Sequence, residues 1–271
     1  MALVFFKGAQ RLSARYEDLG LSHLLPTDRV WVGVRSSEPG TLGGFHHPRQ
    51  GYRHQQMGAI VTRYGSLAVS PSSASELSAL DLFRSYAHDC LHYGSFRQYS
   101  LRDGEVVRTR YGFNLRDADG HTYSAPDPSG SKSTRNLGIV MEGATDREAT
   151  ALTRWVADSL GYVEPASGID RFAFLDVTGR LHGGHLDELS THGNAYLSAM
   201  ASYARSVNLR YDTFLAEIGR DEAADLHKTI VQAMISGHVH HLTAWLDERH
   251  GPGTFRSLFR AASYKGPEPG G

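Results

Sequence analysis

The sequence predicts an α+β fold, in which a mixed sheet near the N-terminus precedes a mostly helical second half. Residues 29–35 (RVWVGVR) alternate in the manner of a half-buried strand. Helical patterns dominate the later part of the chain, over 193–218, 221–236 and 238–249. A chain of 271 residues with 40% hydrophobic residues can also bury a substantial core. We therefore expect one large domain or two small ones.

The region before Pro71 is predicted to be mostly sheet. Residues 40–51 are rich in Gly, His and Pro, which is typical of a loop. Residues 58–70 (GAIVTRYGSLAVS) fit a hairpin or a pair of short strands around Tyr64 and Gly65. These stretches extend the sheet that residues 29–35 begin.

The pattern changes at Pro71, and a first helix is expected there. Ser73 followed by Glu76 fits a capping box, which satisfies backbone N–H groups at a helix start. Apolar side chains then follow at helical spacing: Leu77, Leu80, Leu82, Phe83 and Tyr86. This spacing continues to His92, and Gly94 marks the expected end of the helix.

A hairpin and a loop are expected after this helix. Residues 105–125 have the pattern of two strands, with Asp119 and Gly120 in the turn. Residues 126–133 (PDPSGSKS) are a flexible loop by composition. A second helix should then begin near residue 136 or 142 and end near residue 160. Its buried side is expected to carry three residues, Leu152, Trp155 and Val156.

The order of these elements suggests a division of the chain. Residues 1–95 should hold the N-terminal sheet and the first helix, and residues 96–160 the hairpin insertion and the second helix. Residues 161–265 should form a helical C-terminal subdomain. The tail, 266–271 (GPEPGG), is expected to be disordered.

Composition excludes several classes of partner and site. A formal net charge of -1 gives no basic field for a phosphate backbone, so nucleic acid is not an expected partner. No segment approaches about eighteen consecutive apolar residues, and the N-terminus lacks a clear signal peptide, so we expect a cytoplasmic protein without membrane segments. The single cysteine, Cys90, excludes an intramolecular disulfide and any multi-cysteine zinc site. A metal in this chain must therefore rely on His and carboxylate ligands.

Two pairs of metal-type side chains stand four residues apart on the two central helices. His88 and His92 form the first pair, and Glu142 and Asp146 form the second. Residues at i and i+4 share one face of a helix, so four such side chains can converge between two packed helices. The spacing predicts a metal site.

These motifs resemble those of the zincin metallopeptidases, in particular the gluzincin branch. The HDCLH sequence of residues 88–92 stands in place of HExxH, and the EGATD sequence of residues 142–146 in place of the downstream ExxxD helix. The resemblance covers roughly residues 58–160 by motif order. It implies a zincin-like fold, a Zn²⁺ cofactor, and hydrolysis of a peptide or amide bond in a peptide or small peptide-like substrate.

The resemblance also implies roles for single residues. His88, His92 and Glu142 would bind zinc, and Asp146 would hold a ligand histidine by its second ring nitrogen. Asp89 takes the place of the family's glutamate, the general base that accepts a proton from the attacking water. A His or Tyr of the C-terminal helices would stabilise the oxyanion, and the candidates are Tyr203, His238, Tyr211 and His241.

Asp89 leaves alternatives open, because its side chain is one methylene shorter than glutamate. Its carboxylate would stop about 1 Å short of the family's position, which is enough to slow hydrolysis about a hundredfold. A shifted helix could restore the geometry, or the site could run another reaction. A repurposed zincin fold could also bind or act on a small peptide-like metabolite without peptidase activity. In a further alternative, an HD-type phosphohydrolase, His88 and Asp89 would both bind metal, and Glu142 and Asp146 would have no role.

Overall fold

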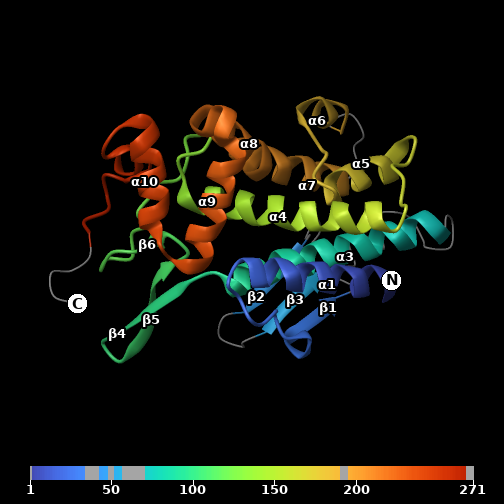
Figure 1. The fold of residues 1–271 in the computed structure, drawn as a ribbon, viewed down its shortest axis with the longest axis horizontal. Coiled ribbons are helices and arrows are strands. Elements are labelled where there is room, and N and C mark those ends of the chain that lie inside the picture. Colours follow the sequence, from blue (N-terminus) through green and yellow to red (C-terminus); the bar gives the residue numbers. More distant parts are fainter. Residues whose placement is uncertain (1, 34–42, 48–51, 57–70, 190–194, 267–271) are drawn as a thin grey trace. The chain divides into compact units, whose positions relative to one another are not determined.

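The computed structural model describes residues 2–33, 43–47, 52–56, 71–189 and 195–266 (Figure 1). The fold is α+β, as predicted, and 64% of it is helical. The strands described there form two three-stranded sheets. Among the described residues, no helix combines the length and the apolar character that crossing a membrane requires.

The chain divides into two compact units, and each unit combines two separate stretches. Unit 1 comprises Met1–Gly94 and Asp146–Arg205, and unit 2 comprises Ser95–Thr145 and Ser206–Gly271. One boundary falls inside helix α4 (Leu137–Ser159), which continues through it without a break. The two halves of α4 therefore belong to different units.

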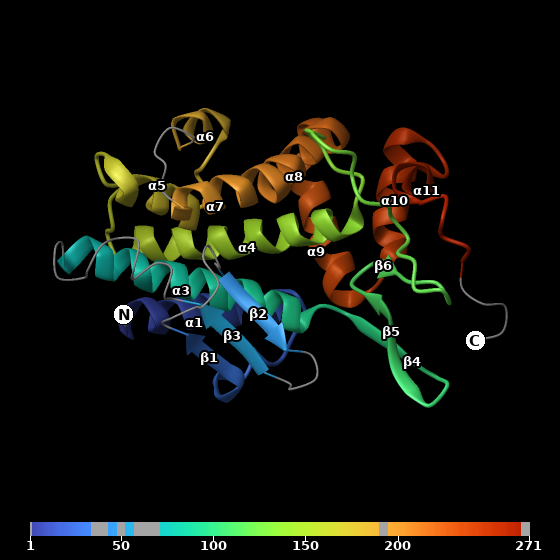
Figure 2. The same cartoon turned by 180° about the vertical axis from the view of Figure 1, so that it is seen from behind.

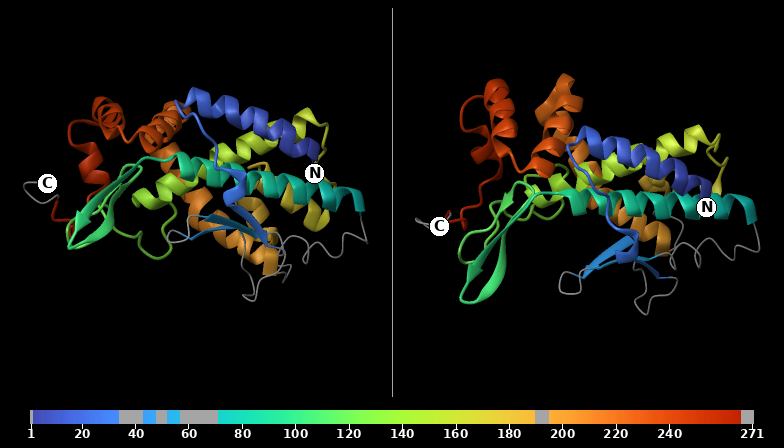
Figure 3. Two further views of the ribbon diagram at one scale, coloured as in Figure 1. Left: turned by 90° about the horizontal axis from the view of Figure 1, so that it is seen from below. Right: turned by 60° about the horizontal axis from the view of Figure 1, so that its bottom comes forward.

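Unit 1 is built mainly of helices around α3 (Pro71–Gly94). Helix α1 (Ala2–Asp18) packs along α3 (Figure 3), where the rings of Phe5 and Phe83 meet edge to face at 6.1 Å. The other helices of this unit are α5 (Gly168–Val177), α6 (Gly183–Leu189) and α7 (Ala195–Tyr203). Helix α1 was not predicted and contradicts the expectation that the region before Pro71 is mostly sheet.

The first sheet also belongs to unit 1 and lies beside α3 (Figure 2). A short 3-10 turn, η1 (Thr27–Arg29), leads into it. Its strands are β1 (Val30–Gly33), β2 (Gly43–His47) and β3 (Tyr52–Gln56), in the order β1-β3-β2. Strand β3 pairs parallel with β1 and antiparallel with β2, so the sheet is mixed, as expected.

Three of the predictions made from the sequence fall in this region. Strand β1 confirms the strand predicted at 29–35 over residues 30–33, and residues 34–35 lie outside the described residues. The loop predicted at 40–51 was wrong in part, because β2 occupies its middle and pairs with β3. The strands predicted at 58–70 lie outside the described residues.

The second sheet belongs to unit 2 and corrects the predicted hairpin. Strands β4 (Arg97–Arg102) and β5 (Glu105–Tyr111) form a long antiparallel ribbon, and β6 (Asn114–Leu115) adds two residues to β5 (Figure 1). The tight turn between β4 and β5 lies at Asp103 and Gly104, both with positive φ. Positive φ at both positions gives a two-residue turn the twist that a hairpin requires. The predicted turn at Asp119 and Gly120 is also present, but it joins only an isolated antiparallel bridge between Arg116 and Thr122. The strand predicted from residue 105 is correct, but its long partner precedes it.

The helices of unit 2 follow the predicted pattern with interruptions. The predicted helix 193–218, whose residues 193–194 lie outside the described part of the chain, starts in unit 1 with α7. It continues through a π-helical segment, η2 (Ala204–Asn208), then α8 (Leu209–Phe214) and a second π-helical segment, η3 (Leu215–Gly219). The predicted helices 221–236 and 238–249 correspond to α9 (Ala223–Ser236), after a 3-10 turn η4 (Arg220–Glu222), and to α10 (Val239–His250). The chain then forms a short helix, α11 (Thr254–Phe259), and residues 267–271 of the predicted tail lie outside the described residues.

The two helices that carry the predicted metal site, α3 and α4, have bounds close to those predicted from the sequence. Helix α3 starts at Pro71, two residues before the predicted capping residue, because proline fits the first turn of a helix. Helix α4 starts at Leu137, close to the earlier of the two predicted positions. On α4, Leu152 and Val156 are buried as predicted, but Trp155 is 43% exposed. The Arg11 guanidinium lies 5.5 Å from the centre of the Trp155 ring, so this indole forms a cation–π contact at the surface.

Candidate metal centre

Helix α3 brings the side chains of His88 and His92 together. The two residues are one helical turn apart, and their rings lie 4.5 Å apart, centre to centre, at an angle of 70°. Both side chains are half-buried. The regular helix therefore presents two imidazoles on one face, as the spacing predicted.

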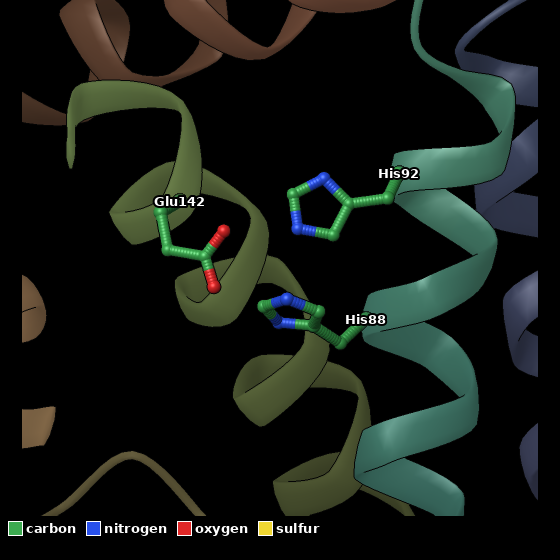
Figure 4. A group of neighbouring side chains, drawn as sticks. All are labelled: His88, His92 and Glu142. Carbon is green, nitrogen blue, oxygen red and sulfur yellow. The ribbon is translucent and has the colours of Figure 1, made fainter. Parts of the chain in front are cut away.

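Glu142 completes the group from helix α4 (Figure 4). One ligand atom from each of Glu142, His88 and His92 lies within 4.8 Å of the others, and the three side chains point toward one another. Because α4 is continuous, Glu142 is held one turn before Asp146, which contacts α3 in unit 1. Among the residues that the structure describes, this is the one group of three or more His, Cys, Asp or Glu side chains with such spacing.

The donor set fits a divalent metal ion such as zinc. Zinc in proteins takes imidazole nitrogens and carboxylate oxygens at about 2.0–2.2 Å, which places tetrahedral ligands about 3.4 Å apart. The separations of up to 4.8 Å in the group are somewhat wider, and small rotations of half-buried side chains close such a difference. Two histidines and one carboxylate also leave one of four positions open, as in hydrolytic zinc sites. The group can hold a metal ion, and its chemistry does not single out which ion.

Asp146 lies behind His88 and sets the orientation of its ring. The Asp146 carboxylate is 2% exposed, and its Oδ1 atom lies 3.5 Å from Nδ1 of His88. A carboxylate facing Nδ1 favours the tautomer with a proton on that nitrogen, which leaves Nε2 as the nitrogen available to an ion. This is the placement that the sequence resemblance implied for Asp146.

A buried charge cluster surrounds Asp146, and the sequence analysis missed it. Arg84 donates from Nη2 to Asp146 Oδ1 at 2.8 Å and from Nη1 to Asp176 Oδ2 at 3.0 Å. The Asp81 carboxylate lies 3.6 Å from the same Nη1 atom. The signal was present, because residues 81, 84 and 88 follow the three- and four-residue spacing of one helix face. We call Asp81, Arg84, Asp146 and Asp176 the Arg84 cluster.

The carboxylates of the Arg84 cluster titrate in opposite directions. For Asp146, burial opposes ionisation, but Arg84 and His88 outweigh it and lower the pKa to about 2. For Asp176, burial prevails over the attraction of Arg84 and raises the pKa to about 6. Burial also raises the pKa of Asp81. The carboxylate nearest to His88 is thus the one whose ionised form the surroundings favour.

Asp89, the predicted general base, follows His88 on α3 and is 3% exposed. It does not belong to the group of three ligand residues. The next residue, Cys90, is fully buried, and burial raises its thiol pKa to about 11. This thiol stays protonated at neutral pH and is a poor nucleophile.

The C-terminal candidates lie in different surroundings. Tyr203, at the end of α7 in unit 1, is half-buried and close enough to Arg84 to influence its pKa. His238 is exposed just before α10 in unit 2, and its ring has His240 and His241 as neighbours at 5.4 and 6.2 Å. Neither Tyr203 nor His238 belongs to the ligand group.

Tyr211 is the C-terminal candidate that packs beside a ligand residue. A Cβ atom added to Gly143, the residue after Glu142, would lie 2.4 Å from Cβ of Tyr211, so α4 and α8 approach closely there. Tyr211 is 1% exposed, and its hydroxyl lies 2.8 Å from Nδ1 of His227. No motif in the sequence marks His227, which stands inside α9.

The chemistry of this group must be inferred from its own side chains. His88, His92 and Glu142 could hold a metal ion, and Asp146 of the Arg84 cluster lies next to His88. No family model, no curated protein and no solved structure matches this chain.

Proposed function

We propose that this protein is a zinc-dependent hydrolase that resembles a gluzincin metallopeptidase and cleaves a peptide or amide bond in a peptide or small peptide-like substrate. The observation that carries the proposal is the convergence of His88, His92 and Glu142, with Asp146 behind His88. These are the four positions that the motif resemblance assigns to ligands and orienting carboxylate. A bound zinc ion would supply a Lewis acid and lower the pKa of water toward neutrality.

The residues of the site have distinct tasks in this proposal. His88, His92 and Glu142 hold the ion, and Asp146 accepts a hydrogen bond from Nδ1–H of His88, so that Nε2 faces the ion. Asp89 accepts the proton of the attacking water at its carboxylate. Its short side chain makes it the weakest part of the machinery, because about 1 Å of displacement costs about a hundredfold in rate.

The ligand group favours this proposal over an HD-type phosphohydrolase. In an HD site, His88 and Asp89 would bind the ion together, whereas the observed group contains Glu142 and omits Asp89. The short Asp89 side chain favours one other candidate function, a repurposed zincin-like fold that binds a small peptide-like metabolite without cleaving it. Both candidates use the same three ligands.

Zinc analysis of the purified protein, followed by substitutions of Asp89, tests the proposal. We expect about one zinc ion per chain in the wild type and in Asp89→Asn, because Asp89 is not a ligand. Cleavage of a peptide library, followed by mass spectrometry of the new termini, should fall at least a hundredfold in Asp89→Asn. Asp89→Glu restores the length of the base and should raise cleavage above the wild-type rate.

Three outcomes separate the candidates. Absence of stoichiometric zinc, together with activity that survives His88→Ala, would exclude a metal mechanism at this site. Zinc binding with no cleavage in the wild type or in Asp89→Glu would favour the metabolite-binding candidate. Loss of zinc in Asp89→Asn with retention in Glu142→Gln would favour the HD arrangement.

A further inference from the structure

We infer that Arg84 is a positioning residue of the metal centre, which acts through Asp146 to fix the imidazole of His88. The inference rests on the proposed function to the extent that His88 is a metal ligand. It follows from a continuous chain of contacts inside unit 1, from Asp176 through Arg84 and Asp146 to His88. Arg84 itself has no place in the ligand group.

A single oxygen atom joins Arg84 to the histidine. Oδ1 of Asp146 lies 2.8 Å from Nη2 of Arg84 and 3.5 Å from Nδ1 of His88. The carboxylate is almost fully buried, so bulk water does not set its orientation. The shorter and charge-assisted contact, the one to Arg84, therefore has the greater influence on where Oδ1 points.

The guanidinium is itself anchored from two other directions. Nη1 of Arg84 donates to Asp176 on α5 at 3.0 Å and lies 3.6 Å from Asp81 on α3. The Arg84 side chain is 14% exposed, so its planar guanidinium group is mostly buried among three carboxylates. Arginine suits this position because its planar guanidinium group donates to two carboxylates in fixed directions, whereas lysine carries one point charge.

Zinc affinity measures this role without any need for a substrate. The wild type, Arg84→Met and Arg84→Lys are titrated with Zn²⁺ in competition with a chromophoric chelator. Loss of partners that orient a ligand histidine typically weakens metal affinity about 10- to 100-fold. We expect a loss of that size in Arg84→Met. Arg84→Lys should fall in between, because it keeps the charge and loses the planar guanidinium group.

A double-mutant cycle tests whether the effect passes through Asp146. Asp146→Asn should weaken zinc binding by a similar factor, and adding Arg84→Met to it should cost less than about twofold more. The matched control is Arg15→Met, which removes another arginine–carboxylate pair, between Arg15 on α1 and Glu148 on α4, with contacts of 2.8 and 3.0 Å. Its zinc affinity should stay within about twofold of the wild type.

Each result has a defined meaning. Wild-type zinc affinity in a folded Arg84→Met protein overturns the inference and leaves the proposed function standing. The inference is also overturned if adding Arg84→Met to Asp146→Asn weakens zinc binding by a further factor of about 10 to 100, because Arg84 then acts independently of Asp146. If Arg84→Met does not fold, by circular dichroism, Arg84→Lys decides, and unchanged affinity there overturns the inference. If the wild type binds no zinc, the proposed function fails, and the role of Arg84 fails with it.

Discussion

Asp176 and Asp146 share one guanidinium but respond to it differently. Both are buried and both contact Arg84, yet the pKa of Asp176 is raised to about 6 and that of Asp146 is lowered to about 2. The difference arises because burial dominates for Asp176, whereas Asp146 gains a second favourable partner in His88. At neutral pH the cluster therefore carries more negative than positive charge, and part of this charge destabilises the fold.

The raised pKa of Asp176 gives a prediction for stability against pH. Its folded-state pKa of about 6 exceeds the ordinary value of 3.8 for an aspartate, so its stabilising contribution is complete below pH 3.8 and is lost as the pH rises through 6. In metal-free protein, the stability of the wild type relative to Asp176→Asn should fall between pH 4 and 7, by up to about 3 kcal/mol. Urea denaturation of both proteins at several pH values measures this difference.

Asp146 serves as a control, because its contribution to stability should depend on pH in the opposite direction. Its pKa is lowered to about 2, so its contribution is present above pH 3.8 and is lost as the pH falls toward 2. Wild-type stability relative to Asp146→Asn should therefore decline on acidification. Equal pH profiles for the two substitutions would contradict the assignment, and so would an NMR titration midpoint near 4 for Asp176.

At the scale of the elements, the close approach of α4 and α8 at Gly143 is needed for the packing of unit 2. A Cβ atom at Gly143 would lie 2.4 Å from Cβ and 2.6 Å from Cγ of Tyr211, and neither Tyr211 atom can swing away as the end of a flexible chain could. Gly143→Ala should therefore destabilise the protein by about 1 to 3 kcal/mol, although alanine is the better helix former. Urea denaturation of the variant measures the loss.

Gly183 is the matched control for Gly143. It also lies in a helix, α6, but an added Cβ meets no atom within 4 Å. Gly183→Ala should change the free energy of unfolding by no more than about 0.5 kcal/mol, or raise it slightly. Equal losses for the two alanine variants would show that the approach of Tyr211 is not the cause.

Local patterns predicted the elements that carry the site and little of what surrounds them. The apolar spacing before His92 and the i, i+4 pairs located α3, α4 and the ligand residues, because helical periodicity is a local property. The pairing of β5 with β4 was missed because the chain holds two Asp-Gly pairs, at 103–104 and 119–120, and both lie in turns. Partners of Arg84 other than Asp81 lie 62 and 92 residues away along the chain, a pairing that only tertiary packing decides.

At the scale of the whole molecule, ligands from both α3 and α4 should couple metal binding to the stability of the fold. An ion that binds only the folded state stabilises it by about 2.7 kcal/mol at a hundredfold excess over Kd. Added zinc should therefore raise the Tm of metal-free wild type by roughly 5 to 10 °C. Differential scanning fluorimetry with and without Zn²⁺ measures the shift.

The shift should depend on the ligand histidines and not on histidine pairs in general. His88→Ala should abolish most of it. His182→Ala should retain it, although the rings of His182 and His185 stack at 3.6 Å elsewhere in unit 1. An equal shift in His88→Ala would place zinc binding at another site of the chain.

The discontinuous units have a consequence for how the chain folds during synthesis. Arg84 is synthesised 62 residues before Asp146 and 92 residues before Asp176, so its contacts with the two carboxylates can form only after those residues are made. Unit 1 lacks its second stretch until residue 205 is made, and by then the first stretch of unit 2 is already present. The chain therefore cannot complete one domain before synthesis of the next begins, although that is the usual order of folding for large chains. Contacts between distant segments should also make its folding slow.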